Sequence, residues 1–187
     1  ASAYQHVDAL IHNAGALSAE YTVSPQGFEM TVASQVLGPF LLTSLLLPLL
    51  EGGESSGRVI AVASGGMYPE KLDVEKLLAG PNSYNGVRAY ARSKRAQVEL
   101  NVEWARRCGS KAIFQAMHPG WVDTPGVVKS LPRFHSIMKP VLRSVEAGAD
   151  TIVWLVDVDA EELGANGGFW LDRHRRSIIK IPGTSAT

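Results

Sequence analysis

Tyr90 and Lys94 are the residues best suited to chemistry in this chain, and they stand four positions apart in the segment Tyr90-Ala91-Arg92-Ser93-Lys94. The surrounding pattern predicts a helix, where a spacing of four places two side chains on one face. An ammonium beside a phenol favours the phenolate and lowers the phenol pKa from its ordinary value of about 10. The pair therefore predicts a general acid/base that works near neutral pH.

Three other polar groups follow apolar runs that are typical of strands. Ser64 follows residues 58–63, Asn13-Ala14-Gly15 follows residues 7–12, and His118-Pro119-Gly120 follows residues 112–117. The carboxyl ends of parallel strands meet at one edge of a sheet, and ligands bind there. Ordinary turn chemistry explains each group singly, but the set as a whole predicts one crevice around Ser64 and Tyr90.

Strand and helix patterns alternate along the chain. The sequence predicts strands over residues 7–12, 58–64, 112–117 and 168–172, and helices over residues 25–50, 88–108 and 145–156. A kink is expected at Gly38-Pro39, a helical turn at 74–78, and short or irregular helix over 125–140. Such alternation predicts an α/β fold with a parallel sheet and helices on both faces. We expect a single domain over residues 1–187.

Composition describes an ordinary globular chain, with 187 residues, 45% hydrophobic content and a formal net charge of zero. The balance gives no electrostatic case for a nucleic acid or an anionic membrane as partner. The most apolar stretch, residues 36–50, is shorter than the roughly 20 residues of a membrane span, so we expect a buried helix and no span. One cysteine, Cys108, fits a reducing compartment, and we expect a cytoplasmic protein.

Two other functions are also compatible with these residues. Ser64, Asp73 and His118 occur in the chain order of α/β-hydrolase triads, but Val62 stands where the nucleophile elbow needs glycine. The second alternative is a non-catalytic interaction module that pairs through its long helices. The histidines show no metal-ligand spacing, so we expect no metal site.

Five stretches in order along the chain resemble the short-chain dehydrogenase/reductase family. They are residues 8–15, 37–43, 58–64, 90–94 and 118–124. Within the family, the chain looks most like the group around dehydrogenase/reductase family member 12. The resemblance implies an oxidoreductase that transfers hydride between NAD or NADP and a small carbonyl or alcohol substrate.

The resemblance also implies roles for individual residues. Tyr90 would exchange a proton with the substrate oxygen, Ser64 would hydrogen-bond that oxygen, and Lys94 would tune Tyr90 and hold the nicotinamide ribose. The remaining cofactor contacts would come from Asn13, Ala14, Gly15, Pro119, Gly120, Val122 and Thr124. Among these, Asn13 would brace the sheet, whereas the Val122 backbone and Thr124 would orient the carboxamide.

The chain departs from the family pattern in two places. Gln35 stands where the family has an asparagine that feeds a proton relay, so it is either a relay residue or a plain surface glutamine. The family's glycine-rich phosphate loop is absent, because none of the 18 glycines forms Thr-Gly-x-x-x-Gly-x-Gly. We therefore expect the C-terminal portion of a Rossmann-like fold, lacking the first three strands, and we expect this portion alone to bind the cofactor poorly and to have little or no activity. The resulting bare sheet edge predicts oligomerisation, poor solubility or a further N-terminal segment that completes the sheet. The resemblance implies a homo-oligomer that pairs through the long helices.

Overall fold

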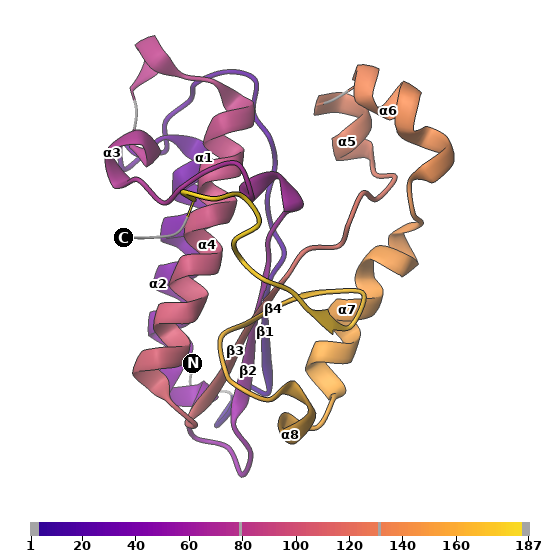
Figure 1. Ribbon diagram of the computed structural model, residues 1–187. Helices are drawn as coiled ribbons and strands as arrows, with labels where there is room; N and C mark the ends of the chain where they lie inside the picture. The colour runs from indigo at the N-terminus through magenta and orange to yellow at the C-terminus, as the bar shows by residue number, and fades with distance from the viewer. Residues whose placement is uncertain (1–3, 79, 131, 185–187) are drawn as a thin grey trace.

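The computed structural model describes residues 4–78, 80–130 and 132–184. Its centre is one five-stranded sheet with the strand order β1-β2-β3-β4-β5 (Figure 1). The strands are β1 (Ala9–His12), β2 (Gly57–Val62), β3 (Ala112–Met117), β4 (Gly168–Leu171) and β5 (His174–Arg175). The first four are parallel, and β5 runs antiparallel to β4. The parallel sheet of the predicted α/β fold is confirmed.

Strand register brings the loops after the strands to one edge of the sheet. His12 pairs with Ala61, Val62 pairs with Met117, and Met117 pairs with Trp170. The parallel strands therefore end nearly level with one another. Within the described residues β1 pairs only with β2, so it is an open edge of the sheet.

Helices cover both faces of the sheet (Figure 1). One face carries α2 (Gly38–Leu50) and α4 (Gly86–Cys108), and the other carries α7 (Val145–Asp157) with the short α8 (Ala160–Leu163). Leu50 and Phe114 belong to the core under α2 and α4, whereas Leu155 and Ile60 belong to the core under α7. Each face of the sheet therefore has its own apolar core, as a doubly covered parallel sheet requires.

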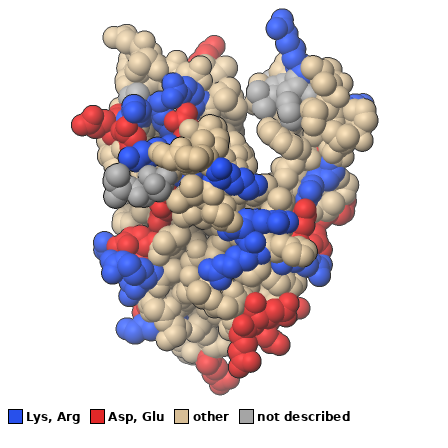
Figure 2. Space-filling view, viewed as in Figure 1, with Lys and Arg blue, Asp and Glu red and all other residues tan. Residues whose placement is uncertain are grey.

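Short helical pieces fill the connections at the carboxyl edge. They are η2 (Gly65–Met67), α3 (Val74–Leu77), η3 (Pro81–Ser83), α5 (Pro125–Ser130), α6 (Pro132–Met138) and η4 (Lys139–Val141). The α5–α6 segment forms an arm that stands apart from α3 and α4 in Figure 1. The space-filling view shows the molecule hollowed between this arm and the rest (Figure 2).

The helix expected over residues 25–50 differs from its prediction in two ways. It begins as α1 (Met30–Val32), continues as the π-helical η1 (Ala33–Leu37), and only then becomes α2. The predicted kink thus takes the form of a π-helical turn just before Gly38. The expectation that residues 36–50 form a buried helix is wrong for one side of α2, where Leu41 and Leu45 are exposed. Only one stripe of α2 packs on the sheet and α4, so no described part of the chain covers its other apolar side chains.

Candidate active site

Ser64 and Tyr90 meet at the carboxyl end of β2. Ser64 caps η2, where its Oγ accepts a hydrogen bond from the Gly66 N–H at 3.1 Å. Tyr90 lies near the start of α4, whose N-terminus is capped by Asn85. Burial raises the pKa of Tyr90 above its ordinary value of 10, and a side-chain hydrogen bond with Ser64 opposes that rise. The phenol is therefore neutral near pH 7 and carries a proton that it can donate.

Lys94 lies one helical turn after Tyr90 and is only 2% exposed. Its Nζ donates a hydrogen bond to the Val62 carbonyl at 2.8 Å and lies 5.6 Å from the centroid of the Tyr90 ring. Burial lowers the pKa of Lys94 from 10.5 to about 8. The prediction that Lys94 lowers the pKa of Tyr90 is wrong for this arrangement, because burial dominates the phenol and the ammonium donates to a backbone carbonyl. An ammonium has three donors, so the group can still bind a ligand hydroxyl.

Gln35 and Gly15 complete a cradle beside Lys94. Gln35 is fully buried in η1, and its Nε2 donates to the Ala16 carbonyl at 2.7 Å, while its Oε1 has no hydrogen-bond partner among the described residues. A Cβ added at Gly15 would lie 3.0 Å from Gln35 Oε1 and 3.0 Å from Lys94 Nζ. The interpretation of Gln35 as a surface glutamine is therefore wrong. The glycine leaves a space that any side chain would fill.

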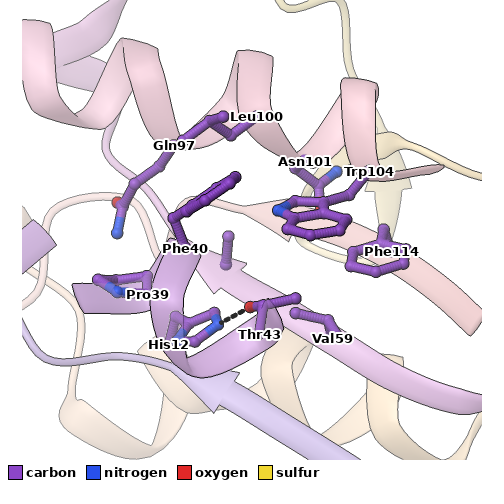
Figure 3. Close-up of a pocket in the computed structure, with 11 residues that line it drawn as sticks. His12, Pro39, Phe40, Thr43, Val59, Gln97, Leu100, Asn101, Trp104 and Phe114 are labelled. Carbon is purple, nitrogen blue, oxygen red and sulfur yellow. Dashed lines mark hydrogen bonds between the residues drawn. The ribbon is translucent and has the colours of Figure 1, made fainter. Parts of the chain in front are cut away.

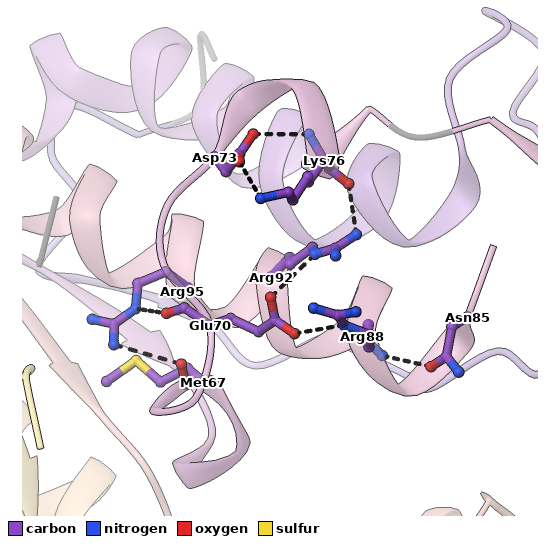
Figure 4. Close-up of polar contacts among 8 residues, drawn as sticks. All are labelled: Met67, Glu70, Asp73, Lys76, Asn85, Arg88, Arg92 and Arg95. Carbon is purple, nitrogen blue, oxygen red and sulfur yellow. Dashed lines mark hydrogen bonds and ion pairs between the residues drawn. The ribbon is translucent and has the colours of Figure 1, made fainter. Parts of the chain in front are cut away.

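Charged contacts fasten the chain after Ser64 to the flank of α4 (Figure 4). The Glu70 carboxylate pairs with Arg88 at 3.0 Å and with Arg92 at 3.2 Å. The fully buried Arg95 donates from Nε to the Glu70 carbonyl at 2.9 Å and from Nη1 to the Ile178 carbonyl at 2.8 Å. These three arginines lie on one face of α4 at spacings of four and three. They hold the loop that follows Ser64 against the helix that carries Tyr90.

His118 stands at the end of β3 as a neutral imidazole. Its Nδ1 accepts a hydrogen bond from the Gly120 N–H at 3.3 Å, and its pKa is lowered from 6.5 to about 4, first by burial and then by nearby cations such as Lys180. Gly120 has a φ of +74°, and a Cβ there would meet the Arg143 guanidinium at 2.8 Å. Pro119 lies between them. A residue with a side chain would be strained in this turn, which explains Gly120 without reference to a cofactor.

Val122 and Thr124 lie at the root of the α5–α6 arm. The Val122 backbone forms an isolated parallel β-bridge with Arg143, and the Val122 side chain packs on Gly148. Thr124 Oγ1 accepts a hydrogen bond from the Val127 N–H at 3.3 Å. Within the described residues neither side chain makes a hydrogen bond to Tyr90 or Lys94. Asn13 and Ala14 are exposed beside Gly15, and the roles expected for these four residues stay predictions.

The residues of the hydrolase alternative do not form a triad. The Asp73 carboxylate accepts from the Lys76 backbone N–H at 3.0 Å and pairs with its ammonium at 2.9 Å. Ser64 bonds to Tyr90, and His118 Nδ1 bonds to Gly120. No hydrogen bond joins Ser64, Asp73 and His118 among residues 4–78, 80–130 and 132–184. The order of these residues in the chain was therefore a misleading signal.

Two buried amides, Gln97 and Asn101, were missed by the reasoning from sequence. Both follow Lys94 on α4 at spacings of three and seven, which place them on the face that carries Lys94. Polar residues repeated on the core-facing side of a helix were the signal that could have found them. They line a cavity between α2 and α4 (Figure 3).

Comparisons with known proteins agree with this geometry. Residues 1–133 match the family described as short chain dehydrogenase. The chain belongs to that family. It is 42% identical over 168 residues to "Dehydrogenase/reductase SDR family member 12" of Bos taurus, covering 89% of this chain and 52% of that protein. It is 33% identical over 187 residues to "Retinol dehydrogenase 14" of Homo sapiens, covering 92% of this chain and 53% of that protein.

The chain spans about half the length of these curated relatives. Among solved structures, it resembles "angucycline C-6 ketoreductase LanV with bound NADP" with a TM-score of 0.63 and 23% identity, covering 88% of this chain and 60% of that one. This likeness shows the fold. The predicted membership in the short-chain dehydrogenase/reductase family and the likeness to family member 12 are both confirmed.

Proposed function

We propose that this chain supplies the catalytic and substrate-binding portion of an NAD(P)-dependent oxidoreductase that acts on a small carbonyl or alcohol compound. The observation that carries the proposal is that the Ser64 and Tyr90 side chains meet beside the buried Lys94 ammonium. Membership in the short chain dehydrogenase family and a solved relative with bound NADP support it.

The proposed chemistry follows from the protonation states of these groups. In the reductive direction, neutral Tyr90 donates its proton to the carbonyl oxygen of the substrate. Ser64 donates a hydrogen bond to the same oxygen and stabilises the charge that develops there. In the oxidative direction, Tyr90 takes the proton from the alcohol. A nicotinamide cofactor supplies or accepts the hydride in this chemistry.

The residues beside Lys94 fit a nicotinamide cofactor. The ammonium keeps donors beyond the one that bonds Val62, and Gly15 leaves the space that an alanine Cβ would take from Lys94 and Gln35. Lys94 would bind the ribose hydroxyls, and Gln35 would position Lys94 in a proton relay. Further contacts are proposed for Asn13, Ala14, Pro119, Gly120, Val122 and Thr124.

Substitution of two tyrosines tests the proposal. We expect Tyr90→Phe to lower kcat by about 10³-fold, because it removes the proton donor and leaves the ring in place. Tyr84→Phe is the matched control, since the Tyr84 hydroxyl only donates to the Ser18 carbonyl. The assay follows oxidation of NADH and of NADPH with aliphatic and aromatic ketones. Equal activity of the wild-type protein and the Tyr90→Phe variant would contradict the proposal.

We also propose a homo-oligomer in the cytoplasm that pairs through α2 and α4. Exposed apolar side chains on α2 support pairing; they are Phe40, Leu41, Leu42 and Leu45. Within the described chain, Met30–Leu50 is the helical stretch long and apolar enough to cross a membrane, with a mean hydropathy of 1.7. Of that window 22% is buried, and Leu46 and Leu47 of α2 pack against the core of the sheet.

The same exposed face favours a second function, a non-catalytic interaction module. Fluorescence titration with NADH and NADPH separates the two functions, because only the oxidoreductase binds the nicotinamide. Analytical ultracentrifugation measures the assembly. A monomer at all concentrations would contradict both the module and the oligomer.

A further inference from the structure

The segment that follows β5 lies against the loop that begins at Ser64. Tyr68 comes four residues after Ser64, and its hydroxyl donates a hydrogen bond to the Ser177 carbonyl at 3.2 Å. The Lys180 ammonium lies 4.4 Å from the centroid of the Tyr68 ring. In Figure 1 this segment, drawn in yellow, crosses in front of the sheet toward α4. The contacts with Tyr68 therefore bring the Lys180 charge close to the candidate active site.

His118 lies beside the same loop. The centroids of the His118 and Tyr68 rings are 6.2 Å apart, and a Cβ added at Gly65 would lie 3.6 Å from His118 Cε1 and Nδ1. Because Nδ1 accepts the hydrogen bond from the Gly120 N–H, we assign the ring proton to Nε2. Nε2 is buried and has no hydrogen-bond partner among the described residues. A buried donor without an acceptor is destabilising, so this part of the site has an unused N–H.

The charged groups around His118 leave an excess of positive charge. Burial is the largest cause of the lowered His118 pKa, and the cations Lys180, Arg143 and Arg176 lower it further. Asp172 is the carboxylate that opposes them, and Arg143 already binds it through both Nη atoms. Arg176 and Lys180 form no ion pair within residues 4–78, 80–130 and 132–184. Two positive charges near the imidazole therefore have no anionic partner in the described chain.

The neighbouring arginines of the β4–β5 hairpin are engaged elsewhere. Arg173 pairs with Asp150, and Arg175 donates to two backbone carbonyls. The space-filling view shows Lys and Arg side chains gathered beneath the hollow between the α5–α6 arm and the rest of the molecule (Figure 2). Arg176 and Lys180 are both exposed. A ligand that enters from solvent can therefore contact these two cations.

We propose that the substrate of the site at Ser64 and Tyr90 carries an anionic group, a carboxylate or a phosphate monoester, that Arg176 and Lys180 bind. This inference rests on the proposed function and names its substrate class, a keto acid or a keto phosphate in the reductive direction. An anion beside Lys180 also brings an acceptor to the neighbourhood of the unused His118 N–H. Cations away from the reacting carbonyl stabilise substrate and transition state alike, so they select the substrate through KM and leave kcat unchanged.

The first experiment measures binding and does not depend on turnover. Isothermal titration calorimetry without cofactor compares aliphatic keto carboxylates and keto phosphates of increasing chain length with their uncharged methyl esters and alcohols. We expect the best anion to bind about tenfold tighter than its uncharged counterpart. This preference should shrink as sodium chloride rises from about 50 to about 500 mM. Equal affinity within every pair overturns the proposal. Binding of inorganic phosphate without any preference among the ketones also overturns it, because the cations would then serve a free ion.

Charge removal then assigns the preference to residues. Arg176→Gln/Lys180→Gln should abolish the preference for the anion, while the uncharged ketones bind as they do to the wild-type protein. Arg107→Gln/Lys111→Gln is the matched control, because it removes the same charge from exposed residues that precede β3, at the opposite end of the sheet. If the first double variant does not fold, Arg176→Gln should lower the preference about threefold and Arg176→Lys should retain it. An unchanged preference in a folded Arg176→Gln variant overturns the proposal.

The second experiment measures turnover. We expect Arg176→Gln/Lys180→Gln to raise KM for the preferred anionic ketone about tenfold at an unchanged kcat. The dissociation constant of NADPH should stay the same in this variant. A weaker NADPH complex with an unchanged KM for the ketone would assign the cations to the cofactor and overturn the proposal. If the wild-type protein turns over no ketone, the proposed function falls, whereas the calorimetry still decides the anion site.

Discussion

The two long helices on one face of the sheet, α2 and α4, contrast with each other: α4 buries polar side chains, and α2 exposes apolar ones. α4 buries Lys94, Arg95 and Gln97, whereas α2 exposes Leu41 and Leu45. The buried charges on α4 have designated acceptors, such as the Val62 carbonyl for Lys94. The exposed leucines on α2 have no packing partner within the described chain. Polar burial on α4 therefore coincides with the proposed catalytic site, and apolar exposure on α2 coincides with the proposed pairing surface.

The largest expected effect lies at the end of β2, where Ser64 faces Tyr90 of α4. Ser64→Ala should lower kcat by about 10²–10³-fold, because it removes the hydrogen bond that stabilises charge on the substrate oxygen. It should also raise the pKa of Tyr90 further, since the bond with Ser64 opposes the effect of burial. A pH–rate profile measures both changes. Ser83→Ala is the control, and equal loss in the two variants would break the assignment of Ser64.

Burial of the Lys94 charge should appear in the stability of the protein. The folded pKa of about 8 lies below the unfolded value of about 10.5, so the unfolded chain binds more protons between these values. The cost of burying the charge is fully present below pH 8 and disappears as pH rises through 10.5. The difference in unfolding free energy between the wild-type protein and Lys94→Met should shift by about 3 kcal/mol in favour of wild type across that window.

Urea unfolding at several pH values measures this difference, and ionisation common to both proteins cancels. A difference that stays constant between about pH 8 and about 10.5 would show that Lys94 titrates normally. The contrast between the two helices would then lose its main electrostatic support.

A substitution at Gly15 tests whether the space between Gln35 of η1 and Lys94 of α4 holds the cofactor. Gly15→Ala should weaken cofactor binding about tenfold, because its Cβ would lie 3.0 Å from Lys94 Nζ and from Gln35 Oε1. Gly80→Ala is the matched control, since a Cβ at that position meets nothing within 4 Å. Fluorescence titration with NADH and NADPH measures both dissociation constants. Equal dissociation constants for the two variants would show that the cradle is unrelated to cofactor binding.

The smallest effect on stability is expected on α2. Leu45 is 67% exposed, so Leu45→Glu should change the unfolding free energy by less than about 0.5 kcal/mol. It should nevertheless weaken self-association, because a charge would enter the apolar face. Val153→Glu on α7 is the control, with 65% exposure on the opposite face of the sheet. Association that responds equally to both variants, or to neither, would remove α2 as the pairing surface.

Sequence reasoning predicted the parallel strands with small shifts at their ends. The run 112–117 matched β3 exactly in extent, and the helix expected over 88–108 began two residues earlier at Gly86. Apolar runs and alternating elements carry this information directly. The antiparallel β5 was missed, because its turn depends on left-handed backbone at Asp172 and Arg173, which neither residue type requires.

The sequence predicted which residues lie together in the candidate site better than it predicted their pKa values. Types and spacing were enough to bring Ser64, Tyr90 and Lys94 together. The direction of the Tyr90 pKa was wrong, because burial and the Val62 carbonyl depend on how the chain packs. The burial of Gln35 and the unpaired amides of Gln97 and Asn101 likewise arise from packing between α4, η1 and α2.

The hydrogen bond from Arg95 to the Ile178 carbonyl joins the segment around residue 178 to α4, the helix that carries Tyr90. Cleavage of the polypeptide before Ile178 would remove this acceptor and leave a buried N–H of the Arg95 guanidinium without its hydrogen bond. The Arg95 side chain also donates to the Glu70 carbonyl, so a shift of Arg95 would also displace the loop that follows Ser64. Proteolysis before Ile178 is thus expected to disturb the proposed active site, although the cleaved bond lies far from Ser64 and Tyr90.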